Sequence, residues 1–224
     1  MRFTEKDKKE SNREYALRVI KENIINLELK PGTMISEQDV ADELKLSRTP
    51  VHEALQELAN TKIIEILPQK GSLVSFINMK LVDEALFLRA AIESAVTEEA
   101  VEKSTEEDIT ALEENVGLQE FYYTKGNLDK LMELDNNFHK LMYRITDKMQ
   151  CHYMVKTMNI HYDRFRELRI HTSDTKVVIN EHKNILQAFK NKDSAKAKEL
   201  ILKHLNRLYV DEKDIRKKYP EFFN

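Results

Sequence analysis

Apolar residues recur along most of this chain at a spacing of three and four, which is the period of an amphipathic helix. The first such stretch covers residues 12–29 and stops at the turn formed by Pro31 and Gly32. After Asn78 the same period predicts a series of helices, over residues 80–102, 106–124, 128–146, 152–170, 176–190 and 194–212. A charged tail follows, over residues 213–224. Apolar stripes of this kind are buried against one another, so we expect a helical bundle.

Residues 36–58 read as two short helices joined by a tight turn. Ser36 and Asp39 have the spacing of a capping box, as do Thr105 and Asp108 later in the chain. Ser47 can cap the second helix, whose first turn tolerates Pro50. That helix has an apolar back (Val51, Leu55, Leu58) and a polar front (Arg48, Thr49, His52, Gln56). A short helix of this design fits the major groove of DNA.

Two β-prone runs, residues 63–67 and 72–77, flank a turn that contains Gly71 and predict a hairpin. Helix, helix-turn-helix and hairpin together make a winged helix-turn-helix, with residues 69–71 at the wing tip. We therefore expect a mainly α fold with two domains. Residues 1–77 would form a winged helix-turn-helix DNA-binding domain with a small β-hairpin wing, and residues 78–224 an all-helical domain, to which the family resemblance given below assigns effector binding and dimerisation.

The amino-acid composition excludes several classes of protein. The chain has 224 residues, only four Gly and no glycine-rich phosphate loop, so neither a Rossmann nor a P-loop enzyme is indicated. Cys151 is the only cysteine, which excludes an internal disulfide and fits a reducing cytoplasm. We find no signal peptide and no apolar run of membrane length, and expect a cytoplasmic protein without a membrane partner.

Charge does not mark the N-terminal part as basic. The net charge is -3, and residues 1–76 hold 12 Lys and Arg against 13 Asp and Glu. DNA binding must then depend on a few placed donors, with Lys45, Arg48, His52 and Lys70 on one face and the carboxylates on the other.

The helical part offers one constellation of metal-binding side chains. Asp135 and His139 are four residues apart and share a helix face, while His182 and His204 lie on two later helices. Imidazole and carboxylate ligands suit Zn²⁺, and also Ni²⁺, Mn²⁺ or Fe²⁺. Spacing alone equally allows each histidine to be an ordinary hydrogen-bonded core or surface residue.

The N-terminal part resembles the GntR family of bacterial transcription regulators. The resemblance rests on Ser47-Arg48-Thr49-Pro50-Val51, Ala54-Leu55 and Leu58, and on the wing pattern Pro68, Gly71 and Val74. The helical part resembles the FCD ligand-binding domain of the FadR-type subgroup. Two residues depart from the family pattern, since His52 replaces the usual Arg and Lys62 the usual Gly before the wing. The second departure suggests a different or strained turn.

The resemblance implies a homodimer that binds double-stranded DNA at a palindromic operator. Arg48 would contact a base edge, and Ser47 and Thr49 would contact phosphates. His52 would donate a hydrogen bond to a base or a phosphate. Lys70 and Gly71 of the wing would approach the backbone or the minor groove. Many FCD domains bind a divalent metal ion through the ligands that Asp135, His139, His182 and His204 match, and the expected ion is Zn²⁺.

Arg89 and Glu93 are similar to an Arg and Glu common on the first FCD helix. Arg89 would meet the carboxylate of an effector, although an intrahelical ion pair with Glu93 explains the same spacing. The expected function is a ligand-responsive repressor that senses a small carboxylate and is not an enzyme. The alternatives are a DNA-binding metal sensor, or a metal-dependent enzyme that uses the His/Asp site, although no H-E-x-x-H motif is present.

Overall fold

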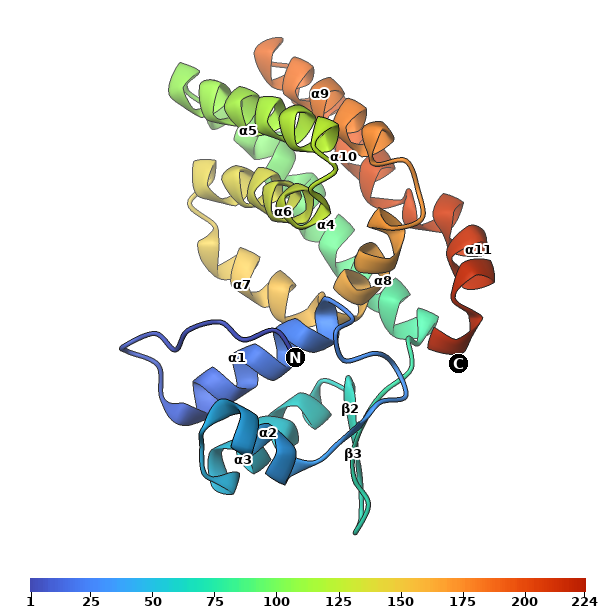
Figure 1. Cartoon of the computed structure of the whole chain (residues 1–224). Helices are drawn as coiled ribbons and strands as arrows, with labels where there is room; N and C mark the ends of the chain where they lie inside the picture. Colours follow the sequence, from blue (N-terminus) through green and yellow to red (C-terminus); the bar gives the residue numbers. More distant parts are fainter. The chain divides into compact units, whose positions relative to one another are not determined.

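The computed structural model describes residues 1–224, and its internal contacts divide the chain into two compact units (Figure 1). The N-terminal unit comprises residues 1–82, 160–167 and 219–224. The helical unit comprises residues 83–159 and 168–218. The domain boundary between residues 77 and 78 stays a prediction.

Three helices build the N-terminal unit: α1 (Asn12–Ile25), α2 (Glu37–Leu44) and α3 (Arg48–Asn60). A capping box between Ser11 and Glu14 begins α1, which ends before the predicted residue 29. The three helices bury a common apolar core, to which α3 contributes Val51, Ala54, Leu55 and Leu58. The back of α3 is therefore fixed by packing, and its polar front is left at the surface.

Capping residues explain most of the turn between α2 and α3. The Ser36 hydroxyl accepts from the Asp39 N–H at 3.3 Å and begins α2. Lys45 ends α2 in the left-handed conformation, with φ of 55°. Ser47 occupies the N-cap position of α3, but its side chain makes no capping hydrogen bond, so that detail of the sequence prediction is wrong.

The wing is part of a three-stranded antiparallel sheet with strand order β1-β3-β2. The predicted hairpin is formed by β2 (Ile64–Leu67) and β3 (Gly71–Val74). The third strand, β1 (Met34–Ile35), was not predicted, because two residues are too few to show an alternation of apolar and polar positions. Gly71 has φ of 109°, and a Cβ there would lie 3.0 Å from the carbonyl oxygen of Ile35. Lys62 stands before the wing with φ of 62°, so a non-glycine residue occupies a strained left-handed position.

Two later segments complete the N-terminal unit. The first is residues 160–167 of α8 (Ile160–Ile170), where Ile160 joins the apolar core. His161 Nε2 lies 2.8 Å from the carbonyl oxygen of Thr61, and Arg164 donates to the carbonyl of Ser75 at 2.6 Å. The second is the 3₁₀ turn η1 (Pro220–Phe222), whose Phe222 carbonyl accepts from the N–H of Ile77. The sequence pattern predicted neither contribution.

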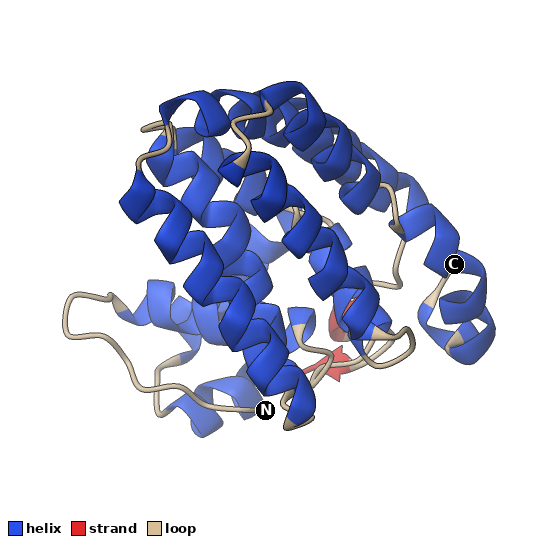
Figure 2. Cartoon of the chain, turned by 90° about the horizontal axis from the view of Figure 1, so that it is seen from above, coloured by secondary structure: helices blue, strands red, loops and turns tan.

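The helical unit is built from helices alone, and helices make up most of the chain (Figure 2). Its members are α4 (Met79–Lys103), α5 (Glu106–Thr124), α6 (Leu128–Ile145), α7 (Met149–Met158), α9 (Thr175–Lys190), α10 (Ser194–Leu205) and α11 (Leu208–Lys218), with the first four residues of α4 in the N-terminal unit. None of the helices is both long enough and apolar enough to cross a bilayer.

The predicted fold class is confirmed: a winged helix-turn-helix is followed by an all-helical part. Helix α5 begins and ends as predicted and carries the capping box of Thr105 and Asp108. Two predicted helices are divided, one at Asn159 and the other after Leu205. Residues 213–218, predicted as tail, continue α11.

Replacing Leu55 by Ala tests the packing that fixes α3. Leu55 is 1% exposed, so we expect the free energy of unfolding to fall by about 2–5 kcal/mol through lost burial and a residual cavity. Denaturant unfolding followed by circular dichroism measures this change. The exposed neighbour Glu53 provides the control, because Glu53→Ala should change stability by no more than about 0.5 kcal/mol. Equal effects of the two substitutions would contradict the assigned core.

Candidate functional site

The helical unit gathers one carboxylate and three imidazoles at its centre. Asp135 and His139 come from α6, His182 from α9 and His204 from α10, and all four are buried. Each offers one ligand atom, and the four atoms lie within 4.8 Å of one another. The structure thus brings together all four residues that the sequence proposed as a metal site.

A chain of buried hydrogen bonds fixes which nitrogen of His182 carries a hydrogen. The amide nitrogen of Asn115 donates to the carbonyl of Leu134 at 3.1 Å, which leaves the Asn115 amide oxygen as an acceptor. That oxygen accepts from the amide nitrogen of Gln119 at 2.7 Å, so the Gln119 oxygen faces Nδ1 of His182 at 2.8 Å. An amide oxygen only accepts, so Nδ1 must donate. The Nε2 lone pair of neutral His182 is then turned inward, and this buried atom has no hydrogen-bond partner.

A carboxylate lies beside Nδ1 of each of the other two imidazoles. His204 Nδ1 lies 3.0 Å from Glu181, whose second oxygen accepts from the guanidinium of Arg207 at 2.7 Å. His139 Nδ1 lies 2.8 Å from Glu93, whose second oxygen accepts from Nε of Arg89 at 2.8 Å. An ionised carboxylate also only accepts, which favours a hydrogen on each Nδ1.

Three Nε2 atoms consequently meet with their lone pairs facing one another. Nε2 of His204 is 3.3 Å from Nε2 of His139, and Nε2 of His182 is 3.6 Å from a carboxylate oxygen of Asp135. With a hydrogen on each Nδ1, Nε2 of His139 and Nε2 of His204 are both acceptors and cannot share a hydrogen bond, an arrangement that a cation between them relieves. Two nitrogen ligands of a tetrahedral Zn²⁺, each at about 2.0–2.1 Å, would stand roughly 3.3 Å apart. These residues therefore fit a divalent metal ion.

Burial keeps His182 and His204 in the neutral form that binds metal. Desolvation lowers the pKa of His182 well below its ordinary value, and the neighbouring His204 lowers it further. Desolvation also lowers the pKa of His204 to about 4, although the hydrogen bond to Glu181 opposes this. Burial alone would raise the pKa of Glu93, but the charge of the Arg89 guanidinium opposes it, and the carboxyl stays ionised.

Arg89 lies within this arrangement as the partner of Glu93. The ion pair that the four-residue spacing allowed is present, and both side chains are buried. Arg89 therefore acts on His139 through Glu93, whereas its predicted contact with an effector carboxylate stays a prediction.

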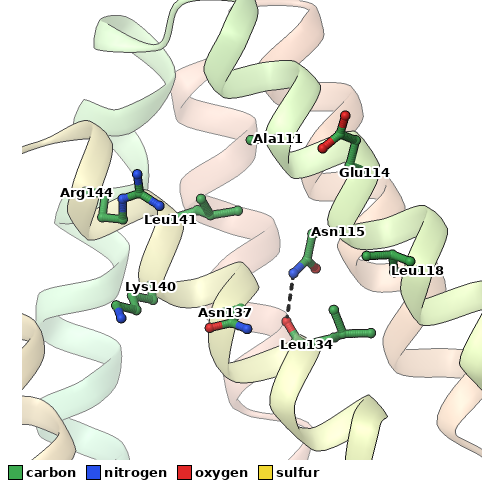
Figure 3. A pocket seen from close by; sticks show the side chains of 9 residues that line it. All are labelled: Ala111, Glu114, Asn115, Leu118, Leu134, Asn137, Lys140, Leu141 and Arg144. Carbon is green, nitrogen blue, oxygen red and sulfur yellow. Dashed lines mark hydrogen bonds between the residues drawn. The ribbon is translucent and has the colours of Figure 1, made fainter.

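The hydrogen bond from Asn115 to Leu134 also borders a groove between α5 and α6 (Figure 3). The groove has a volume of about 370 Å³ and is lined by Ala111, Glu114, Asn115, Leu118, Leu134, Asn137, Lys140, Leu141 and Arg144. Asn115 thus links the buried histidines to a surface feature of the helical unit.

The predicted DNA-contacting residues lie on two elements of the N-terminal unit. Ser47, Arg48, Thr49 and His52 are exposed at the start and on the front of α3, at the surface left by its buried back. Lys70 and Gly71 lie where the turn of the wing enters β3, and Lys70 is exposed. Their contacts with DNA stay predictions.

The sequence analysis did not predict which side chains orient the predicted site residues, and it named Glu93 only as the partner of Arg89. In the helical unit these are Glu93, Gln119 and Glu181, and in the N-terminal unit Glu37 contacts both Arg48 and His52. A signal existed only for Glu93, which is one turn from Arg89. The others approach their partners from different helices, so no spacing along the chain reveals them.

Comparison with known proteins agrees with both parts of the structure. The FCD domain matches residues 84–207, and the gntR family of bacterial regulatory proteins matches residues 13–74. The HTH-type transcriptional repressor RspR of Escherichia coli (strain K12) is 31% identical over 208 residues, covering 92% of this chain and 91% of that protein. The gluconate operon transcriptional repressor of Bacillus subtilis (strain 168) is 26% identical over 206 residues, covering 89% and 82%.

A solved structure shows the same fold. Escherichia coli McbR/YncC matches with a TM-score of 0.78 at 19% identity, covering 94% of this chain and 99% of that one. The agreement spans the winged helix-turn-helix and the helical part together. The chain belongs to the GntR family of bacterial transcription regulators, and its helical part carries the FCD domain.

Proposed function

We propose that this regulator is a cytoplasmic, homodimeric repressor that binds a palindromic operator and responds to a small carboxylate at a divalent metal ion. The observation that carries the proposal is the orientation of the three buried imidazoles. Each Nδ1 meets an acceptor, and each Nε2 is turned toward Asp135 and the other two rings. A purely structural histidine cluster gains nothing from facing lone pairs.

Asp135, His139, His182 and His204 would hold the metal, with Zn²⁺ as the expected ion and Ni²⁺, Mn²⁺ or Fe²⁺ as alternatives. When bound, the metal supplies positive charge and open coordination positions for a carboxylate oxygen. Gln119, Glu93 and Glu181 keep the three rings in the ligating tautomer. The buried guanidinium of Arg89 adds positive charge beside the same site.

The front of α3 would read the operator from the major groove. Arg48 is the candidate for a bidentate contact with guanine, and Ser47 and Thr49 suit phosphates. His52 faces the same surface, and Lys70 and Gly71 would approach the backbone or the minor groove from the wing. Two copies related by a two-fold axis would place two such helices about 34 Å apart, which requires a palindrome.

Effector binding must favour one of two arrangements of the dimer, because a ligand with equal affinity for both states shifts nothing. Repression is proposed because two related proteins are named as repressors. In a metal-sensor version of the same function, the metal itself would be the effector.

Arg48→Ala tests the recognition helix. Loss of a bidentate base contact should weaken operator binding by about 1–3 kcal/mol, roughly 5- to 150-fold, and relax preference at one base pair. Fluorescence anisotropy with the selected operator measures the affinity. Arg216→Ala removes a matched, partly exposed arginine from the helical unit and should leave binding unchanged. Unchanged operator affinity of Arg48→Ala would refute the assignment.

The double variant His139→Ala/His204→Ala tests the ligand set. It removes two of four ligands, so we expect the purified protein to lose its stoichiometric metal, as measured by elemental mass spectrometry. DNA release by small carboxylates should disappear with the metal. In the wild-type protein, release by added metal without any carboxylate would favour the metal sensor. Retention of one metal per chain in the double variant would show that the ligands are misassigned.

Gln119→Ala tests the hydrogen-bond chain behind His182. Without the amide oxygen, the Nδ1 hydrogen loses its acceptor and the ring its fixed orientation, so metal affinity should fall about 10- to 100-fold. Competition with a chromophoric chelator measures this affinity. Gln187→Ala is the control, because Gln187 is exposed and bonds only Asn191 among side chains. Equal metal affinities of the two variants would exclude the proposed role of Gln119.

A further inference from the structure

Glu37 lies at the junction of the two helices of the helix-turn-helix. It is the first residue of α2, and its carboxylate contacts two side chains from the front of α3. One oxygen accepts from Nη2 of Arg48 at 3.3 Å, and the other lies 2.7 Å from Nδ1 of His52. Arg48 and His52 are four residues apart, so one carboxylate holds both from the same side.

These contacts are poorly suited to stabilising the fold. The side chains of Arg48 and His52 are 65% and 52% exposed, and that of Glu37 is 25% exposed. Exposed ion pairs of this kind contribute little to stability, because solvent screens them and ordering the side chains costs entropy. A carboxylate close to a DNA-facing surface also repels phosphates. A carboxylate at this position is therefore better explained by an effect on what Arg48 and His52 recognise than by a gain in stability.

The contact with Glu37 determines the hydrogen-bonding character of His52. An ionised carboxylate only accepts, so Nδ1 of His52 carries the hydrogen that is donated to Glu37. In a neutral imidazole the other nitrogen, Nε2, is then an acceptor. The two acceptors that guanine presents in the major groove, N7 and O6, offer nothing to such an atom, whereas the amino groups of adenine and cytosine do.

Arg48 is restrained by the same carboxylate but keeps its character as a donor. Nη2 is its one atom in contact with Glu37, and the guanidinium has further N–H groups that can meet the O6 and N7 acceptors of guanine. One carboxylate therefore supports two opposite preferences on one helix face: a donor at Arg48 and an acceptor at His52.

We propose that Glu37 is a positioning residue for DNA sequence recognition, which makes His52 an acceptor for the amino group of adenine or cytosine and holds Arg48 ready for guanine. The inference rests on the proposed function, since it requires α3 to enter the major groove. It assigns a base preference to His52 and a role to a residue that need not touch DNA itself.

The test compares base preferences among variants. Duplexes are selected from a random library by the full-length wild-type protein at about pH 8, and the enriched site is measured with every base at each position. His52→Arg, whose side chain only donates, identifies the position read by residue 52. We expect adenine or cytosine there for the wild type and guanine for His52→Arg.

Glu37→Ala should reduce the wild-type preference at that position about tenfold, while affinity for random-sequence DNA stays the same or rises because a negative charge is lost. Glu37→Gln should restore the preference, because its amide oxygen still accepts from Nδ1. Glu43→Ala, which removes an exposed carboxylate from the same helix, should leave both base preferences unchanged.

Three results would overturn the inference: guanine preferred by the wild type at the position read by residue 52, no position altered by His52→Arg, or an unchanged preference in Glu37→Ala. A wild-type protein that enriches no sequence at all would instead refute the proposed DNA-binding function, and this inference with it. Circular dichroism of each variant separates loss of recognition from loss of fold.

Discussion

The chain of hydrogen bonds from the carbonyl of Leu134 to the imidazole of His182 governs the chemistry of the helical unit. It passes through two amides, and each amide has its orientation set by the one before it. A backbone carbonyl cannot rotate or change its protonation, so the direction of the whole chain is fixed at its origin. The result is a buried lone pair on Nε2 of His182 that water does not reach. Unsatisfied polar atoms cost about 1–3 kcal/mol each, so such a site is retained only where something makes use of it.

The two units restrain their polar residues by different means. In the helical unit, three imidazoles are held by buried partners, and tight packing prevents them from turning outward. On α3, Arg48 and His52 are exposed, and only Glu37 limits their motion. The rings of the buried cluster therefore have fixed orientations before any ligand binds. The exposed surface suits a large ligand, whose own groups complete the ordering of the side chains that meet it.

Much of this fold could be predicted from the sequence, but only where apolar residues recur at a regular period or a local motif is present. Helix α5 was predicted to the residue because a capping box begins it and Gly126 follows it closely. The four clustered residues were found through one i, i+4 pair and a family resemblance. In contrast, β1 has two residues and no period, and the predicted helix over residues 152–170 gave no sign of the interruption at Asn159. The roles of Gln119, Glu181 and Glu37 were not predicted, because each bonds a residue on another helix. The spacing of residues along one helix gives no information about such a bond.

Residues 160–167 have a consequence for how such a protein can evolve. They follow the winged helix-turn-helix by about eighty positions in the sequence, yet Ile160 fills part of its core and His161 meets the carbonyl of Thr61. The DNA-binding module is therefore discontinuous in the gene. A single crossover after the wing would join the module to a foreign helical part that lacks these side chains. Successful recombination between relatives has to transfer residues 160–167 and 219–224 together with the winged helix-turn-helix, or to conserve the contact surfaces of these two later segments.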